Sequence, residues 1–188
     1  MVRKPKPRVS RQVRGRTRRG WWPLALLVTL AACGAAQPSA SHTRGLETLS
    51  FSLPNTQGQQ VSPADFAGRV VLVDIWATWC KPCMLSLPFY ADLHERYEAQ
   101  GLTILGVNID EEAGTLAEYL VEHPLPFTVL RDPQSSLPAS LDVETMPTSV
   151  LIGRDGRVLY VHDGFDDGEQ VEVEERVVAA LGGTSQGQ

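Results

Sequence analysis

The hydrophobic pattern is strongest at residues 70–76, where Val-Val-Leu-Val-Asp-Ile-Trp forms a nearly continuous apolar run rich in β-branched residues. Such a run is typical of a central strand that is covered on both faces. Ahead of it, Leu49, Phe51 and Leu53 alternate with polar residues, and residues 59–61 follow a turn-rich segment. These positions predict an N-terminal β-hairpin that precedes the buried strand.

After the buried strand, helical and extended patterns alternate. Between Leu87 and Tyr97, apolar residues recur at steps of three and four, which predicts a helix with one buried face. Strands that alternate with helices imply a partly parallel α/β sheet, and the turn at residues 154–156 predicts that the sheet finishes with an antiparallel hairpin. We further expect strands at 102–109, 127–130, 149–153 and 157–162, and helices at 113–122, 136–141 and 169–181.

Positive and negative charges are separated along the sequence. Nine of the 17 Lys and Arg residues lie between Arg3 and Arg19, whereas all 22 acidic residues come at or after Glu47. Beyond Cys33, eight basic residues stand against 22 acids, which is a net charge of −14. A body of this charge would be repelled by a phosphate backbone, so a nucleic-acid partner is not expected.

The basic head has the composition of an export signal. Residues 21–32 are almost wholly apolar and end in Leu-Ala-Ala before Cys33, which is the expected order of charged, apolar and small residues. The run is shorter than the roughly 20 residues that a spanning helix needs. A small residue before a cysteine resembles the bacterial lipoprotein signal, which implies cleavage and acylation of Cys33. The alternatives are an uncleaved anchor and an ordinary signal cut nearby, and residues 17–19 (Thr-Arg-Arg) hint at twin-arginine export.

The chain is therefore expected to have four parts. A signal peptide covers residues 1–32, and a flexible tether rich in Ala, Gln, Pro, Ser and Thr covers 33–45. One compact domain of common size follows at 46–183, before a short tail at 184–188. We expect the domain to be a monomer.

The strongest chemical signal is Trp79-Cys80-Lys81-Pro82-Cys83, which lies where the buried strand gives way to a helix. Two cysteines on the first turn of a helix can close a small disulfide, and the helix dipole stabilises a thiolate on the first of them. We expect Cys80 to attack a partner disulfide and Cys83 to resolve the mixed disulfide. Lys81 and Pro82 are expected to tune the redox potential, and this chemistry requires no cofactor.

Two other uses of the cysteine pair are a zinc site and a static structural disulfide. Structural zinc needs four ligands, and the sequence has no second cysteine pair. Its four histidines are scattered over the tether, two predicted helices and a strand end, so no metal is expected: His42, His94, His123 and His162.

Residues 73–83 (Val-Asp-Ile-Trp-Ala-Thr-Trp-Cys-Lys-Pro-Cys) resemble thioredoxin, and the flanks resemble its extracytoplasmic relatives of the TlpA/ResA type over roughly residues 47–182. The resemblance includes Gly68, Pro88 and the Met-Pro-Thr sequence at 146–148. It implies a thioredoxin-like α/β fold with a mixed central sheet flanked by helices. Residues 109–138 are more than thioredoxin needs there, which resembles the insertion of the TlpA/ResA group.

The resemblance also implies roles for individual residues. The residue matching Pro147 follows a cis peptide bond in that family and packs beside the cysteines, so Met146 and Pro147, with Trp79, are expected to dock substrate. Asp74 matches a buried acid that manages the proton of the resolving cysteine. Burial should raise the pKa of such a lone carboxyl towards neutrality. The alternative is a solvated or hydrogen-bonded Asp74.

Two positions depart from the family pattern. Gly106 falls where thioredoxin has a lysine beside the buried acid, and Ser86 falls where TlpA/ResA relatives commonly carry a glutamate. We expect the acidic runs at 110–112 and 172–175 to be solvated faces. Trp76 and Trp79 are expected to pack around the active site rather than bind a ring ligand.

These features predict a periplasmic, lipid-anchored protein-disulfide oxidoreductase that reduces disulfides in client proteins such as apocytochrome c. A reductant in that compartment must be recharged, by family analogy through a membrane thiol donor. One alternative is a disulfide oxidant or isomerase, which would have a higher reduction potential. The other is a thioredoxin-like copper chaperone that uses Cys80, Cys83 and His162.

Overall fold

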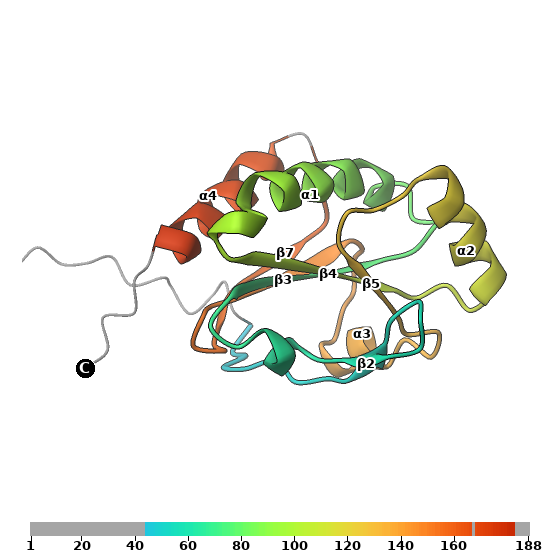
Figure 1. Ribbon diagram of the computed structural model, residues 1–188, viewed down its shortest axis with the longest axis horizontal. Coiled ribbons are helices and arrows are strands. Elements are labelled where there is room, and N and C mark those ends of the chain that lie inside the picture. The colour runs from blue at the N-terminus through green and yellow to red at the C-terminus, as the bar shows by residue number, and fades with distance from the viewer. Residues whose placement is uncertain (1–43, 167, 183–188) are drawn as a thin grey trace, which may run out of the picture. The chain divides into compact units, whose positions relative to one another are not determined.

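The computed structural model describes residues 44–166 and 168–182, which form a mixed five-stranded sheet with helices on both faces (Figure 1). The expected signal peptide at 1–32, the tether up to residue 43 with Cys33, and the tail at 184–188 lie outside the described residues. The strands have the order β5-β4-β3-β6-β7. Their bounds are β3 (Val70–Trp76), β4 (Leu102–Asn108), β5 (Thr128–Arg131), β6 (Thr148–Ile152) and β7 (Val158–Asp163).

The strand directions confirm the predicted mixture. Strand β3 pairs in parallel with β4, and β4 pairs in parallel with β5. On the other side, β3 pairs antiparallel with β6, and β6 with β7. A separate two-stranded hairpin forms from β1 (Leu53–Pro54) and β2 (Gln60–Val61), as expected from the alternation ahead of β3.

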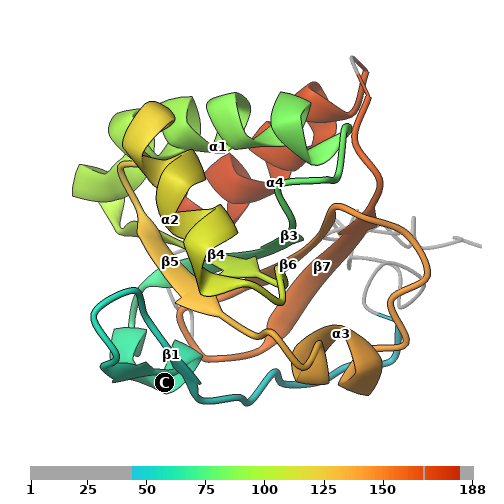
Figure 2. The same ribbon diagram turned by 90° about the vertical axis from the view of Figure 1, so that its right-hand side faces the viewer.

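The helices lie on the two faces of this sheet (Figures 1 and 2). Helices α1 (Cys83–Tyr97) and α4 (Glu169–Gly182) cover one face, whereas α3 (Ser136–Ser140) and the β1–β2 hairpin lie on the other. Helix α2 (Ala113–Glu122) connects β4 to β5. The short 3-10 helices η2 (Pro63–Phe66) and η3 (Glu98–Gln100) complete the elements, of which η2 was not expected from the sequence.

Alternate residues of β3 supply two separate halves of the core. Val70, Leu72 and Trp76 pack into the cluster that includes α1 and α4, whereas Val71, Val73 and Ile75 pack into the cluster on the α3 side. All of these side chains are buried, and each contributes roughly 1.5–3 kcal/mol of burial free energy. This two-sided burial explains why the apolar run in the sequence is nearly continuous.

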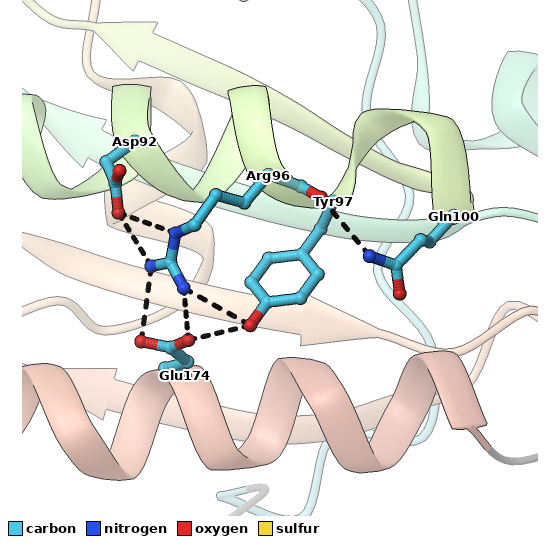
Figure 3. A network of polar contacts seen from close by, with 5 residues as sticks. All are labelled: Asp92, Arg96, Tyr97, Gln100 and Glu174. Carbon is cyan, nitrogen blue, oxygen red and sulfur yellow. Dashed lines mark hydrogen bonds and ion pairs between the residues drawn. The ribbon is translucent and has the colours of Figure 1, made fainter.

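A surface network joins α1 to α4 (Figure 3). The Arg96 guanidinium forms ion pairs with Asp92, one turn earlier on α1, and with Glu174 on α4. The Tyr97 hydroxyl donates to the same Glu174 carboxylate at 2.7 Å. These contacts fix the two helices that cover the face of the sheet on which Asp74 lies.

Among the described residues, no helix combines the length and the hydropathy that a membrane crossing requires.

Candidate active site

Cys80 and Cys83 form a disulfide at the point where β3 ends and α1 begins. The Cys80 side chain is 5% exposed, and Cys83 is completely buried. The expectation that both cysteines lie on the first helical turn is wrong in one respect, because α1 begins at Cys83 and Cys80 precedes it. The physical reason is the turn at Lys81 and Pro82, with Pro82 at the N-cap of the helix.

The start of α1 nevertheless acts on Cys80. The backbone N–H of Cys83 donates to the Cys80 sulfur at 3.3 Å, and the N–H of Met84 donates to the Cys80 carbonyl oxygen at 3.3 Å. An N–H donor and the positive end of a helix dipole both stabilise negative charge on the sulfur. Of the two cysteines, Cys80 is thus the more exposed one and the one whose sulfur accepts from a helix N–H.

Asp74 lies in β3, on the sheet face that α1 covers, and its side chain is fully buried. Neither of its carboxylate oxygens has a hydrogen-bond partner in the structure. Burial raises the pKa of Asp74 from 3.8 to about 8. This confirms the expectation for a lone buried carboxyl, and the alternative of a solvated or hydrogen-bonded Asp74 is wrong.

The neighbour of Asp74 on β4 is Gly106, in register with it. A Cβ atom at Gly106 would come within 3.0 Å of both the Trp76 indole nitrogen and the Phe127 ring. No side chain fits there without movement of these rings, since real Cβ contacts are longer. The packing of Trp76 and Phe127 therefore disfavours a lysine at position 106. As a result, Asp74 has no positively charged neighbour on β4 at this position.

On the other side of Asp74, the same row of the sheet continues into polar residues, and nothing in the sequence indicated that they lie in line with Asp74. Ser149 on β6 pairs with Asp74, and His162 on β7 pairs with Ser149. The buried His162 ring lies 3.0 Å from the Tyr160 hydroxyl and 3.3 Å from a Glu169 carboxylate oxygen. These residues come together only through strand pairing, so spacing along the chain gave no signal for them.

His162 was also the third residue of the copper alternative. The described residues contain no group of three or more His, Cys, Asp or Glu side chains placed to hold a metal ion. The structure therefore does not bring His162 to Cys80 and Cys83 as a ligand set.

Two of the three residues expected to dock substrate, Trp79 and Met146, line one groove, and Pro147 is buried directly after Met146. The peptide bond between Met146 and Pro147 is cis, as the resemblance implies. Of the two tryptophans expected to pack around the active site, Trp76 is fully buried, with its ring centroid 5.5 Å from that of Tyr119, whereas Trp79 is 66% exposed. A groove of about 520 Å³ brings Trp79 and Met146 together, and its lining is completed by Ile109, Ser135, Pro138, Ala139, Asp142, Val143 and Glu144.

Asp110 is a site residue that the sequence reasoning missed. It was expected on a solvated face, but it is 3% exposed. Its carboxylate accepts from the Thr78 N–H at 3.2 Å, the Thr78 hydroxyl at 3.1 Å and the Asn108 amide at 2.7 Å. These bonds hold the turn that leads into Cys80. The available signal was its position at the end of a parallel strand beside β3, where carboxyl ends meet at one edge.

Four features define the class of protein: the strand order, the buried acid, the cysteine pair at the start of a helix and the groove beside it. Together they are those of a thioredoxin-like thiol-disulfide oxidoreductase. The chain matches the Redoxin family over residues 38–180 and belongs to that family. It is 30% identical over 128 residues to thiol-disulfide oxidoreductase ResA of Bacillus thuringiensis, covering 68% of this chain and 74% of the relative. It is 29% identical over 145 residues to ResA of Bacillus subtilis, covering 74% of this chain and 81% of the relative.

Solved structures agree with this assignment. A Chlorobium tepidum protein assigned as thiol:disulfide interchange protein DsbE superposes with a TM-score of 0.70 at 38% identity, over 73% of this chain and 96% of the other. A Neisseria meningitidis protein assigned as a thioredoxin superposes with a TM-score of 0.66 at 28% identity, over 76% of this chain and 95% of the other.

Proposed function

We propose that this protein reduces disulfides in client proteins outside the cytoplasm while it is anchored to a membrane by lipid at Cys33. The observation that supports the proposal most directly is the asymmetry of the cysteine pair. Cys80 retains some exposure and receives a helix N–H, whereas Cys83 is completely buried. An accessible nucleophile beside a protected resolving thiol is the arrangement that exchange with a large client requires.

The reaction begins with the reduced pair. The Cys80 thiolate attacks one sulfur of the client disulfide, a mixed disulfide forms, and the other client sulfur leaves as a thiolate. Cys83 then loses its proton and attacks Cys80, which releases the second client sulfur. The client gains two electrons and two protons, and the chain is left with the Cys80–Cys83 disulfide of the structure.

We assign the proton of Cys83 to Asp74. The carboxyl lies on the sheet face that α1 covers, and Cys83 belongs to the buried cluster of that face. A pKa of about 8 allows Asp74 to take up or give back a proton near neutral pH, as a general base or acid must. Exposed Lys81 adds positive charge beside Cys80, and Pro82 sets the turn, so both tune the potential.

Trp79, Met146 and Pro147 are proposed to receive the client chain, because they share or border the groove beside Cys80. The donor that reduces the pair again is proposed to be a dithiol protein of the membrane. Disulfide-bearing clients follow from the class of enzyme, and apocytochrome c is the client proposed from the TlpA/ResA resemblance. In this proposal electrons flow from the cysteine pair to the client. The oxidant or isomerase alternative differs in that the pair would accept electrons or rearrange disulfides.

The mechanism is tested by replacing Cys83→Ser and mixing the reduced protein with a disulfide-bearing client. The mixed disulfide through Cys80 should accumulate, because the resolving thiol is gone, and it should be visible on a non-reducing gel. The matched variant Cys80→Ser should form none, since Cys83 is buried. Accumulation through Cys83 instead of Cys80 would contradict the assignment of the nucleophile.

A further inference from the structure

The groove beside the cysteine pair carries charge of one sign only. Its apolar part is formed by Trp79, Ile109, Val143 and Met146, together with Pro138 and Ala139. The charged residues in its lining are both acids, Asp142 and Glu144, and both are exposed.

Neither Asp142 nor Glu144 takes part in an ion pair among residues 44–166 and 168–182. Arg44 lines a neighbouring depression together with both acids, but its ion pair is with Asp163, and it also donates to the Leu141 carbonyl. The two carboxylates are therefore free to interact with an incoming chain.

Hydrogen bonds to Asp132 stabilise the start of α3, the helix that precedes these two acids. Asp132 accepts from the N–H groups of Ser136 at 3.0 Å and Leu137 at 2.8 Å, at the start of α3. It also accepts from the Ser136 hydroxyl at 2.7 Å. The backbone then turns at Asp142, whose φ is 49°, before it reaches Met146. The groove is thus lined by residues of α3 and of the segment that leads from α3 to Met146, opposite Trp79 and Ile109.

We propose that this groove selects client segments in which an apolar residue and one or two Lys or Arg residues flank the disulfide cysteine. The inference rests on the proposed function, and it names the class of segment that the same site prefers. The apolar residue would pack against Trp79 and Met146, while the basic residues would lie near Asp142 and Glu144. The net charge of −14 beyond Cys33 acts in the same direction, because it attracts basic clients before contact.

The size of the preference follows from the exposure of the acids. An exposed ion pair is weak, but an acidic client would replace each attraction by a repulsion at two positions, so we expect roughly a tenfold difference in rate between basic and acidic clients at low salt. Lys81 is not part of the groove lining. At 1 M salt the Debye length is about 3 Å, so the difference should fall to about twofold or less.

The test uses three synthetic peptides that each carry one disulfide beside a leucine and differ only in two flanking positions, which are both lysine, both glutamine or both glutamate. The full chain is reduced, freed of reductant and mixed with each peptide, and the second-order rate of peptide reduction is measured. The wild type should reduce the lysine peptide fastest and the glutamate peptide slowest. The double variant Asp142→Asn with Glu144→Gln should bring the rates to within about twofold of one another.

A matched double variant, Glu95→Gln with Glu175→Gln, removes two exposed acids from α1 and α4 and should keep the wild-type ratio. Glu95 is about 18 Å along α1 from Cys83, too far for a direct contact. This control variant should reduce neutral 2-hydroxyethyl disulfide at the wild-type rate, which shows that its dithiol is intact. The Asp142 and Glu144 variant should keep the far-UV circular dichroism of the wild type, which shows that its fold is intact.

Equal wild-type rates for the three peptides at low salt would overturn the charge preference and leave the oxidoreductase in place. A ratio that survives the Asp142 and Glu144 changes would overturn the assignment to the groove. If no peptide and no small disulfide is reduced, the proposed function fails, and the inference fails with it.

Discussion

The burial of Asp74 makes the stability of the oxidised protein depend on pH in a specific way. The carboxyl has a pKa of about 8 in the folded protein and about 3.8 when it is exposed on unfolding. Because the folded value is raised, the folded state binds more protons than the unfolded state between these two pH values. Stability is therefore full below about pH 3.8 and decreases as the pH rises to about 8.

The magnitude follows from the difference between the two pKa values, which is close to four. At 1.36 kcal/mol for each tenfold change in the protonation equilibrium, the loss over the whole window is roughly 6 kcal/mol. This figure is an upper bound, because local relaxation and water penetration reduce the cost of a buried charge. Asp74→Asn removes the titration while it keeps the size of the side chain, so the variant should be the more stable protein at pH 8.

The assay is denaturant unfolding of both oxidised proteins at intervals from pH 4 to pH 9. The difference in free energy of unfolding between Asp74→Asn and the wild type should increase by several kcal/mol up to about pH 8 and then become constant. Asp142→Asn is the control, because Asp142 is exposed, and its curve should run parallel to that of the wild type. Parallel curves for Asp74→Asn as well would refute the burial argument.

Two further predictions concern Asp110 and the proposed lipid at Cys33. Asp110→Ala leaves the N–H and hydroxyl of Thr78 without their partner and should lower the free energy of unfolding by about 1–3 kcal/mol, together with the rate of disulfide reduction. The exposed neighbour provides its control: Glu111→Ala should stay within about 0.5 kcal/mol of the wild type. Lipid attachment is tested with labelled fatty acid, which should enter the wild type and not Cys33→Ser; label in the variant would exclude acylation at that cysteine.

Much of the fold could be predicted because its signals are local. The run at residues 70–76 is apolar on both faces and became β3, which is buried throughout. The step from that strand into a cysteine pair and a helix placed the disulfide correctly in sequence. The helix start was misplaced by three residues, since the turn at Lys81 and Pro82 depends on backbone geometry rather than on hydrophobic period.

Other parts of the site depend on contacts that no local pattern records. Asp110 stands in an acidic run, and only the pairing of β3 with β4 shows that its carboxylate faces Thr78. Trp76 and Trp79 are three residues apart, yet one is buried by the strand and the other is exposed beyond its end. The polar row from Asp74 to His162 likewise exists only through strand register.

Whether the cysteine pair acts as a reductant is decided by its reduction potential. The full chain is equilibrated with reference dithiols of known potential, and the fraction with a Cys80–Cys83 disulfide is measured after acid quenching and thiol labelling. The account predicts a potential near or below about −250 mV, close to the value of thioredoxin. A potential of about −120 to −180 mV, in the range of strong oxidants and isomerases, would contradict it and identify a disulfide donor or isomerase.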